Sequence, residues 1–188
     1  NEQLVAHENN EDTYIKSNNI FFIFETLNGE VFTRENLASI ERTTNESWQL
    51  PYSTRVDSIT NFQYTEVIDD DLNVADLVED ALSLTDEQIL RVKNIASNEI
   101  ALVNRLLSDR NHSAGVNVVL NLPDDTMQAQ GEATAVLVKA ARQLRREIEA
   151  DNSNIKIHLQ GLSIVNTAFN ESAEYDAQYL FPILFVII

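Results

Sequence analysis

The last ten residues of the sequence, 179–188 (YLFPILFVII), contain no charged side chain, and Pro182 is the one residue among them that is not plainly apolar. A folded domain buries such side chains, since each large apolar group left in water forgoes roughly 1.5–3 kcal/mol. Two interpretations follow. The run is a strand or helix in the core of this domain, or it is the first half of a transmembrane helix. Ten helical residues rise about 15 Å, which is half of a hydrocarbon core of about 30 Å.

The composition describes a folded and strongly acidic protein. The 188 residues are 44% apolar and 23% charged, and their formal net charge is −17. That length suits one sizeable domain or two small ones. An acidic chain repels nucleic-acid phosphates and anionic lipid headgroups, so we expect no nucleic-acid partner. The lack of cysteine excludes disulfides, thiol catalysis and thiolate metal sites. The sequence begins without Met or an apolar signal segment, so we expect a piece of a larger protein.

The first third of the chain predicts a strand followed by a helix. Residues 1–17 are polar and aperiodic, which indicates a lead-in. Residues 18–26 (NNIFFIFET) hold five consecutive large apolar residues, which favours a central strand buried on both faces. Thr33 is a plausible N-cap for a helix that continues to about Trp48. Its expected buried stripe consists of Leu37, Ile40, Thr44 and Trp48.

The middle of the chain predicts a hairpin and a short helix. Residues 55–67 alternate loosely between apolar and polar, and residues 72–78 are the expected hairpin partner across Asp69–Asp71. The sequence TDEQ from Thr85 has the pattern of a capping box ahead of a short helix. Residues 98–108 are compatible with either a helix or a strand.

The last third predicts strand, helix, strand and a final helix. We expect strands at 116–122 (VNVVLNL) and 155–159 (IKIHL), a long helix at 126–150, and a last helix from Gly161. The expected core stripe of the long helix consists of Ala133, Val136, Leu137, Ala140, Ala141, Leu144 and Ile148. The whole order is β-α-β, an insertion of hairpin and short helix, then β-α-β. This order predicts an α+β fold with the ferredoxin-like split βαβ arrangement and two helices on one face of the sheet.

The sequence offers no catalytic constellation. Its four glycines form no phosphate-binding motif. His7 and His112 lie in polar stretches, and His158 is expected on the polar face of a strand, so none is spaced as a metal ligand or as a general base. We expect no catalytic residue, metal or cofactor, and the sequence assigns no substrate-binding residue.

The charged clusters have simple structural interpretations. Asp69–Asp71 and Asp124–Asp125 lack the spacing and the glycine of an EF-hand. They suit a solvated hairpin turn and a helix N-terminus, where carboxylates interact favourably with the helix dipole. The Arg-rich stretch 139–146 suits a solvated helix face. Asp176 stands six residues before Pro182, so it is either an ordinary residue at the end of a helix or part of a hinge before a membrane span.

Several blocks together resemble a known family. These are NNIFFIFET at residue 18, VFTRENLASIE and LPYSTRVDSITN within residues 31–61, then VNVVLNLP, IKIHLQG and YLFPILFVII. They are similar to the first large periplasmic loop of resistance-nodulation-division (RND) transporters, in the branch of predicted exporters akin to MMPL-type lipid transporters. The resemblance covers residues 18–188, and residues 31–61 are its most specific part.

The resemblance implies a division of the chain and a role. Residues 18–170 would form a periplasmic porter-like domain, and residues 171–188 would begin a transmembrane helix in the bacterial inner membrane. The family couples proton entry to export of hydrophobic or amphiphilic molecules, with its proton-relay carboxylates in membrane helices that this chain lacks. The implied partners are the membrane helices and second periplasmic loop of the same transporter, together with a lipid-like substrate. A homo-oligomer is a further alternative, and no enzymatic activity is implied.

Two other functions are compatible with the sequence. One is an extracytoplasmic protein–protein interaction module, which an apolar surface patch far from the membrane-proximal end would favour. The other is a stand-alone α/β binding domain without catalysis. Fold alone does not give function, and the sequence contains no basic phosphate-binding loop that would support a hydrolase.

Overall fold

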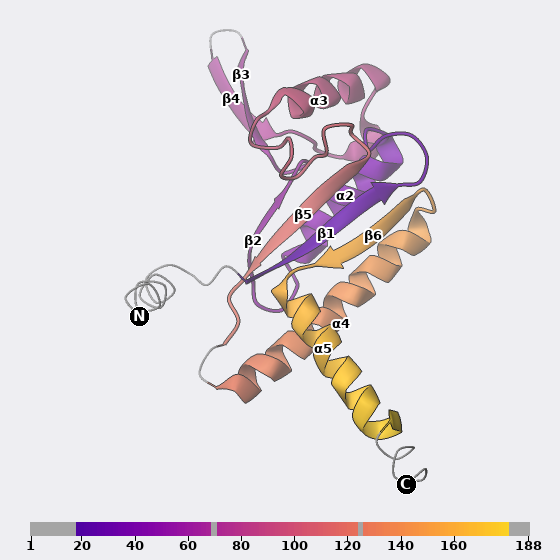
Figure 1. Cartoon of the computed structure of the whole chain (residues 1–188). Helices are drawn as coiled ribbons and strands as arrows, with labels where there is room; N and C mark the ends of the chain where they lie inside the picture. The colour runs from indigo at the N-terminus through magenta and orange to yellow at the C-terminus, as the bar shows by residue number, and fades with distance from the viewer. Residues whose placement is uncertain (1–17, 69–70, 124–125, 181–188) are drawn as a thin grey trace.

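The computed structural model describes residues 18–68, 71–123 and 126–180 and has an α+β fold (Figure 1). Its centre is a four-stranded sheet in which every neighbouring pair of strands is antiparallel, in the order β2-β5-β1-β6. The four strands are β1 (Asn18–Thr26), β2 (Ser53–Ser58), β5 (Ser113–Leu120) and β6 (Ile155–Gln160). The prediction of an α+β fold is therefore confirmed.

Two βαβ connections interlock in this sheet. Helix α2 (Arg34–Ser47) joins β1 to β2, and helix α4 (Met127–Asp151) joins β5 to β6. Strand β5 lies between β1 and β2, and β1 lies between β5 and β6. Each connection therefore crosses over one strand that belongs to the other connection. Helix α2 packs against β2 and β5, α4 packs against β6, and the helices touch each other, so both lie on one face of the sheet.

The helix-covered face of the sheet forms the core. Ile20, Phe22 and Phe24 of β1 are at most 1% exposed and face buried residues of α2 and α4. On the opposite face, which we call the open face, Phe21 and Ile23 are only half-buried. The prediction that this strand is buried on both faces is therefore wrong. Its continuous apolar run reflects one fully buried face and one face that the insertion covers in part.

Helix α2 begins where its sequence predicts. The Thr33 hydroxyl accepts a hydrogen bond from the Asn36 N–H at 3.2 Å, which satisfies one of the free donors of the first turn. Leu37, Ile40 and Thr44 are buried as expected, but Trp48 is 47% exposed. Trp48 is the C-cap residue, and the helical stripe continues at the fully buried Ser47 instead.

Helix α4 carries most of its expected core stripe. Its N-cap is Thr126, whose hydroxyl accepts a hydrogen bond from the Ala129 N–H at 3.1 Å. Val136 is 56% exposed, whereas its near neighbour Val138 is 1% exposed. Each residue turns a helix by about 100°, so the two valines lie on opposite sides of the central stripe, and the core lies toward Val138. The residues buried on this helix are Ala133, Leu137, Val138, Ala141, Leu144 and Ile148.

An insertion between β2 and β5 packs at one end of the sheet. It contains the hairpin β3 (Gln63–Ile68) and β4 (Asp71–Asp76), the 3-10 helix η1 (Ala81–Ser83) and helix α3 (Asp86–Asn98). The expected single stretch 55–67 is thus two strands, because the chain turns after Ser58, whose N–H donates to Asn61 Oδ1 at 2.8 Å.

Two contacts with α2 fix the insertion. The two carboxylate oxygens of Glu41 accept hydrogen bonds at 2.8 Å from the backbone N–H groups of Asp80 and Ala81, at the start of η1. The Arg34 guanidinium donates to Leu84 O and to Asp86, both at 2.5 Å. Helix α3 begins with the expected capping box between Thr85 and Gln88.

Residues 99–112, which include most of the stretch with an ambiguous prediction, form irregular turns rather than a helix or a strand. Leu102 and Leu107 of this stretch are at most 2% exposed, and they join the core. The following strand β5 begins and ends earlier than the expected range 116–122.

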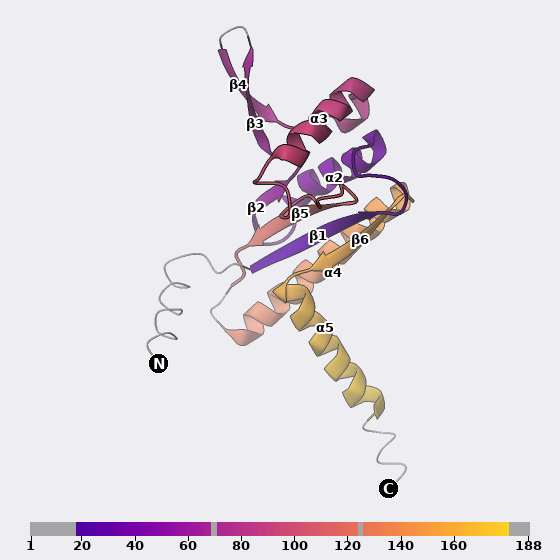
Figure 2. The same cartoon turned by 45° about the horizontal axis from the view of Figure 1, so that its top comes forward.

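The C-terminal helix leaves the sheet and projects from the rest of the structure (Figures 1 and 2). Helix α5 (Leu162–Tyr175) buries only Ser163, and residues 171–178 are all exposed. The expected continuous helix ends at Tyr175 and is followed by the π-helical turn η2 (Asp176–Leu180). In the three described ranges no helix combines the length and the apolar character needed to cross a membrane. The lead-in 1–17 and most of the apolar run, residues 181–188, lie outside the described residues.

The two sides of α4 provide a test of the core. Leu137→Ala should lower the free energy of unfolding by about 2–5 kcal/mol, because it removes a fully buried side chain and leaves a cavity. Val136→Ala is the matched control on the exposed side and should change it by about 0.5 kcal/mol or less. Urea denaturation of both variants measures the difference, and equal losses would contradict the described orientation of α4.

Candidate functional site

The open face of the sheet carries the site with the clearest ligand-sized cavity. A pocket of about 610 Å³ lies between this face and the irregular segment 101–106. That volume is within the range of roughly 300–1,000 Å³ typical of small-molecule sites. The pocket is lined by Phe21, Val56, Asp57, Ser58, Asn61, Phe62, Gln63, Ala101, Leu102, Arg105, Leu106 and Asn117.

Phe21 lines this pocket, and together with Gly115 it also lines a neighbouring hollow. A Cβ atom added at Gly115 would lie 2.3 Å from Phe21 Cζ, so the ring occupies the space that any other residue would need. Segment 101–106 is tied to the same strand, because the Gly115 N–H donates to Leu106 O at 2.8 Å. A second hollow of about 210 Å³ shares Phe21, Arg105 and Leu106 with the first. The two hollows are therefore adjacent, and we call them together the sheet-face groove.

The groove was not predicted from the sequence, although one signal for it was available. Gly115 lies inside strand β5, and an isolated glycine within a strand often marks a close approach of another group. Which group approaches depends on the pairing of β1 with β5, and that pairing joins residues about a hundred positions apart.

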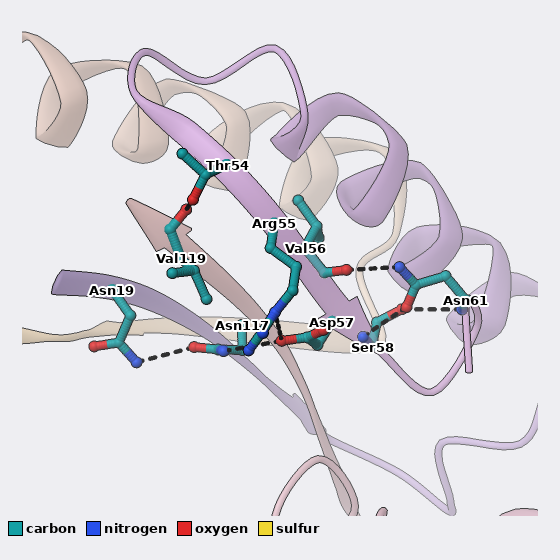
Figure 3. A network of polar contacts seen from close by, with 9 residues as sticks. All are labelled: Asn19, Thr54, Arg55, Val56, Asp57, Ser58, Asn61, Asn117 and Val119. Carbon is teal, nitrogen blue, oxygen red and sulfur yellow. Dashed lines mark hydrogen bonds and ion pairs between the residues drawn. The ribbon is translucent and has the colours of Figure 1, made fainter. Parts of the chain in front are cut away.

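A row of polar side chains crosses three strands beside the floor (Figure 3). Asn19 Nδ2 donates to Asn117 Oδ1 at 2.9 Å, and Asn117 Nδ2 points toward Asp57 Oδ2 at 3.4 Å. Arg55 Nε donates to the same Asp57 oxygen at 3.0 Å. The row links β1, β5 and β2, and it neutralises the Asp57 carboxylate within the protein.

A second polar cluster closes the end of β2. Asn61 Oδ1 accepts from Ser58 N–H at 2.8 Å and Asn61 Nδ2 donates to Val56 O at 2.7 Å (Figure 3). The Ser58 hydroxyl also contacts Thr44 Oγ1 at 2.9 Å and Thr60 Oγ1 at 2.8 Å, all in the buried interior. No histidine is hydrogen-bonded to these hydroxyls in the described ranges, so the cluster has the geometry of a structural network rather than of an activated nucleophile.

The two histidines that the structure describes, His112 and His158, line neither hollow of the groove. His158 is exposed on β6, and its Nε2 lies 2.9 Å from Glu25 Oε2 on the neighbouring strand β1, in agreement with the expected polar face. His112 is exposed in the turn before β5, where its backbone oxygen accepts from the Thr26 N–H at 3.0 Å. His7 lies outside the described residues.

The acidic clusters form no metal site where they are described. Asp71 begins β4 and is exposed, whereas Asp69, Asp70, Asp124 and Asp125 lie outside the described residues. Within the described ranges no group of three or more histidine, aspartate or glutamate side chains is placed to hold a metal ion. Asp176 is exposed and begins the π-helical turn η2, at the position of the expected hinge.

The Arg-rich face of α4 is more than a solvated surface. Two guanidinium nitrogens of Arg142 donate to the two carboxylate oxygens of Glu171 on α5, at 2.5 and 3.0 Å. This hydrogen bonding lowers the pKa of the Glu171 carboxyl below its usual value near 4.5 and raises the pKa of Arg142. The paired charges connect α5 to the domain at a point where few apolar contacts do so.

The lining of the groove is suited to binding a partly apolar molecule. The groove combines aromatic and aliphatic walls with side-chain amides and charged groups, and it contains no paired nucleophile and base among the described residues. In comparisons with known proteins, no protein-family model and no curated protein matches this chain. Membership of the RND family therefore stays a prediction.

The Phe21–Gly115 contact can be tested with a matched pair of glycine substitutions. Gly115→Ala should lower the free energy of unfolding by roughly 1–3 kcal/mol and displace the Phe21 ring, because the new methyl group overlaps it. Gly131→Ala is the control, since it lies in α4 with open space around it and should stabilise the helix by up to about 1 kcal/mol. Thermal unfolding and the NMR shifts of the Phe21 ring measure both effects. An unmoved ring in Gly115→Ala would contradict the contact.

The attachment of α5 should depend on acid pH. The pKa of Glu171 is lower in the folded protein than in the unfolded chain, so the pair stabilises the fold fully above the unfolded value. This stabilisation is lost as the pH falls through the lowered pKa, that is, below about 4.5. The protection factors of the amides in residues 162–175, that is, their hydrogen-exchange rates corrected for the intrinsic dependence of exchange on pH, should therefore fall at low pH. Glu171→Gln should remove this pH dependence, and Glu174→Gln is the control.

Proposed function

We propose that this chain is the extracytoplasmic porter-type domain of an RND-type, proton-driven membrane transporter that exports hydrophobic or amphiphilic molecules. The observation that carries the proposal is the course of α5. This helix leaves the sheet, residues 171–178 in its second half and just after it are exposed, and the apolar run 179–188 follows in the sequence. A helix in that position suits a mechanical link between a soluble domain and a membrane helix.

The order of the strands supports the proposal. The sheet order β2-β5-β1-β6, with two interlocked βαβ connections and both helices on one face, supports the proposal that the domain has the ferredoxin-like arrangement of porter subdomains. The sheet-face groove suits passage or temporary binding of a partly apolar molecule, and the proposal needs no catalytic residue. We place the chain at the bacterial inner membrane, with residues 18–170 in the periplasm.

The proposed partners fit an unpartnered surface beside α5. Leu162, Val165 and Phe169 are 47–70% exposed and lie three or four residues apart, on one side of the helix. A hollow of about 680 Å³ separates this region from the start of α4. The membrane helices and second periplasmic loop of the same transporter would cover it, and a second copy of the chain is the alternative occupant.

A second function, an extracytoplasmic interaction module, is favoured by the hairpin β3–β4. Leu72 and Val74 of β4 are 74% and 56% exposed. The hairpin projects at the end of the structure opposite α5 (Figure 1). Exposed apolar groups far from the proposed membrane side are what such a module would use to bind another protein.

The size and location of the native protein separate these functions. An antibody raised against residues 18–170 should detect a band several times larger than 21.3 kDa, confined to the inner-membrane fraction. A soluble band near 21.3 kDa would overturn the transporter proposal and favour a stand-alone α/β binding domain. A third outcome would favour the interaction module: the protein is found in the membrane fraction, and deletion of its gene leaves export unchanged but disrupts a protein complex.

A further inference from the structure

The polar groups that line the sheet-face groove are nearly all paired within the protein. Asp57 accepts from Arg55 and faces Asn117, and both ends of the Asn61 amide are bonded to Ser58 and Val56. Gln63 donates to Asp76 on the neighbouring strand β4. Paired groups of this kind shape a cavity and gain little from a ligand, because their hydrogen bonds are already made.

Arg105 differs from all of them. It lines both hollows of the groove, it is an exposed residue, and its guanidinium makes no hydrogen bond or ion pair with any residue of the described ranges. Its backbone is held in place, since the Arg105 N–H donates to Leu102 O at 3.1 Å. A guanidinium presents five N–H donors and no acceptor, so the chemical partner that it lacks is an anion.

The charges around the groove leave one positive charge without a partner. The lining contains two charged residues, Asp57 and Arg105, and Asp57 forms an ion pair at 3.0 Å with Arg55, which lies outside the lining. This local excess is unlike the whole chain, whose net charge is −17. The surrounding negative charge disfavours polyanions by long-range repulsion, whereas a single negative group can be held at short range.

The remaining walls are apolar. Phe21 lies on Gly115 as the floor, and Phe62, Leu102 and Leu106 complete the sides. The second hollow extends this surface past Phe21 toward Ile23. An elongated apolar body can therefore lie along the open face of the sheet while its end reaches Arg105.

We propose that the sheet-face groove binds an amphiphile with one anionic group and a single hydrocarbon chain, with the anion on Arg105 and the chain along Phe21, Phe62 and Leu106. The biological role of this binding rests on the proposed function, because the bound amphiphile would be the class of molecule that the transporter exports. The binding itself is a property of these residues.

Calorimetric titration of the 188-residue chain with decanoate tests the proposal. Decanoate, below its micelle concentration, should bind saturably with one site per chain. Decyltrimethylammonium has the same chain with the opposite charge, and butanoate has the same charge with a short chain. Both should bind at least tenfold more weakly, because the first is repelled by Arg105 and the second leaves the apolar walls uncovered.

Charge-matched variants locate the site. Arg105→Gln should weaken decanoate binding about tenfold or more, because charge-assisted hydrogen bonds are roughly twice as strong as neutral ones. Arg110→Gln removes the same charge from an exposed turn that lines neither hollow, and it should leave the affinity unchanged. Phe21→Ala should weaken the binding of decanoate and leave the already weak binding of butanoate unchanged.

The outcomes are distinguishable from those of the proposed function. Absence of saturable decanoate binding, equal binding of the cationic amphiphile, or equal effects of the two arginine variants would each overturn the site. If the protein is an inner-membrane transporter but its domain does not bind decanoate as described, the proposed function stands and the proposed binding site is wrong. If the protein is soluble with a mass of about 21.3 kDa and binds decanoate as described, the proposed binding site stands and the proposed function is wrong.

Discussion

Strand β1 is the constraint on which the rest of the structure depends. It pairs with β5 on one side and β6 on the other, so both βαβ connections are joined through it. Its alternate residues Ile20, Phe22 and Phe24 fill the core beneath the two helices. The residues between them, Phe21 and Ile23, provide the apolar floor of the open face. A single run of apolar residues thus stabilises the fold and forms the groove.

The groove depends on two parts of the chain that differ in role. The sheet supplies its floor and its polar row, whereas segment 101–106 of the insertion supplies the wall that carries Arg105. The insertion starts after β2 and returns at β5, and these two strands are paired neighbours. In topological terms it is a long hairpin loop. Its sequence can therefore change the wall of the groove without altering the connections of the sheet.

Local signals in the sequence predicted much of the fold. The hydroxyls of Thr33 and Thr85 cap helices where expected, and apolar or alternating runs indicated β1, β5 and β6. Strand β2 was predicted only as part of the longer stretch 55–67. Burial was less predictable, because Trp48 and Val136 suit a helical stripe equally well until the neighbouring elements are placed. The groove could not be predicted from patterns in neighbouring residues of the sequence. Its polar row joins Asn19 to Asn117, 98 positions apart, and no periodicity shows that pairing.

The position of β1 has a consequence for the synthesis of the protein. Both partners of this strand come late in the sequence, so roughly 90 further residues must be added before β5 can pair with it, which takes about 5–18 s at ordinary translation rates. During that time the segment 20–24 (IFFIF), which has no charge and high strand propensity, has no strand to pair with. The nascent chain is then most vulnerable to aggregation, and a chaperone that binds short apolar segments would act at this stage.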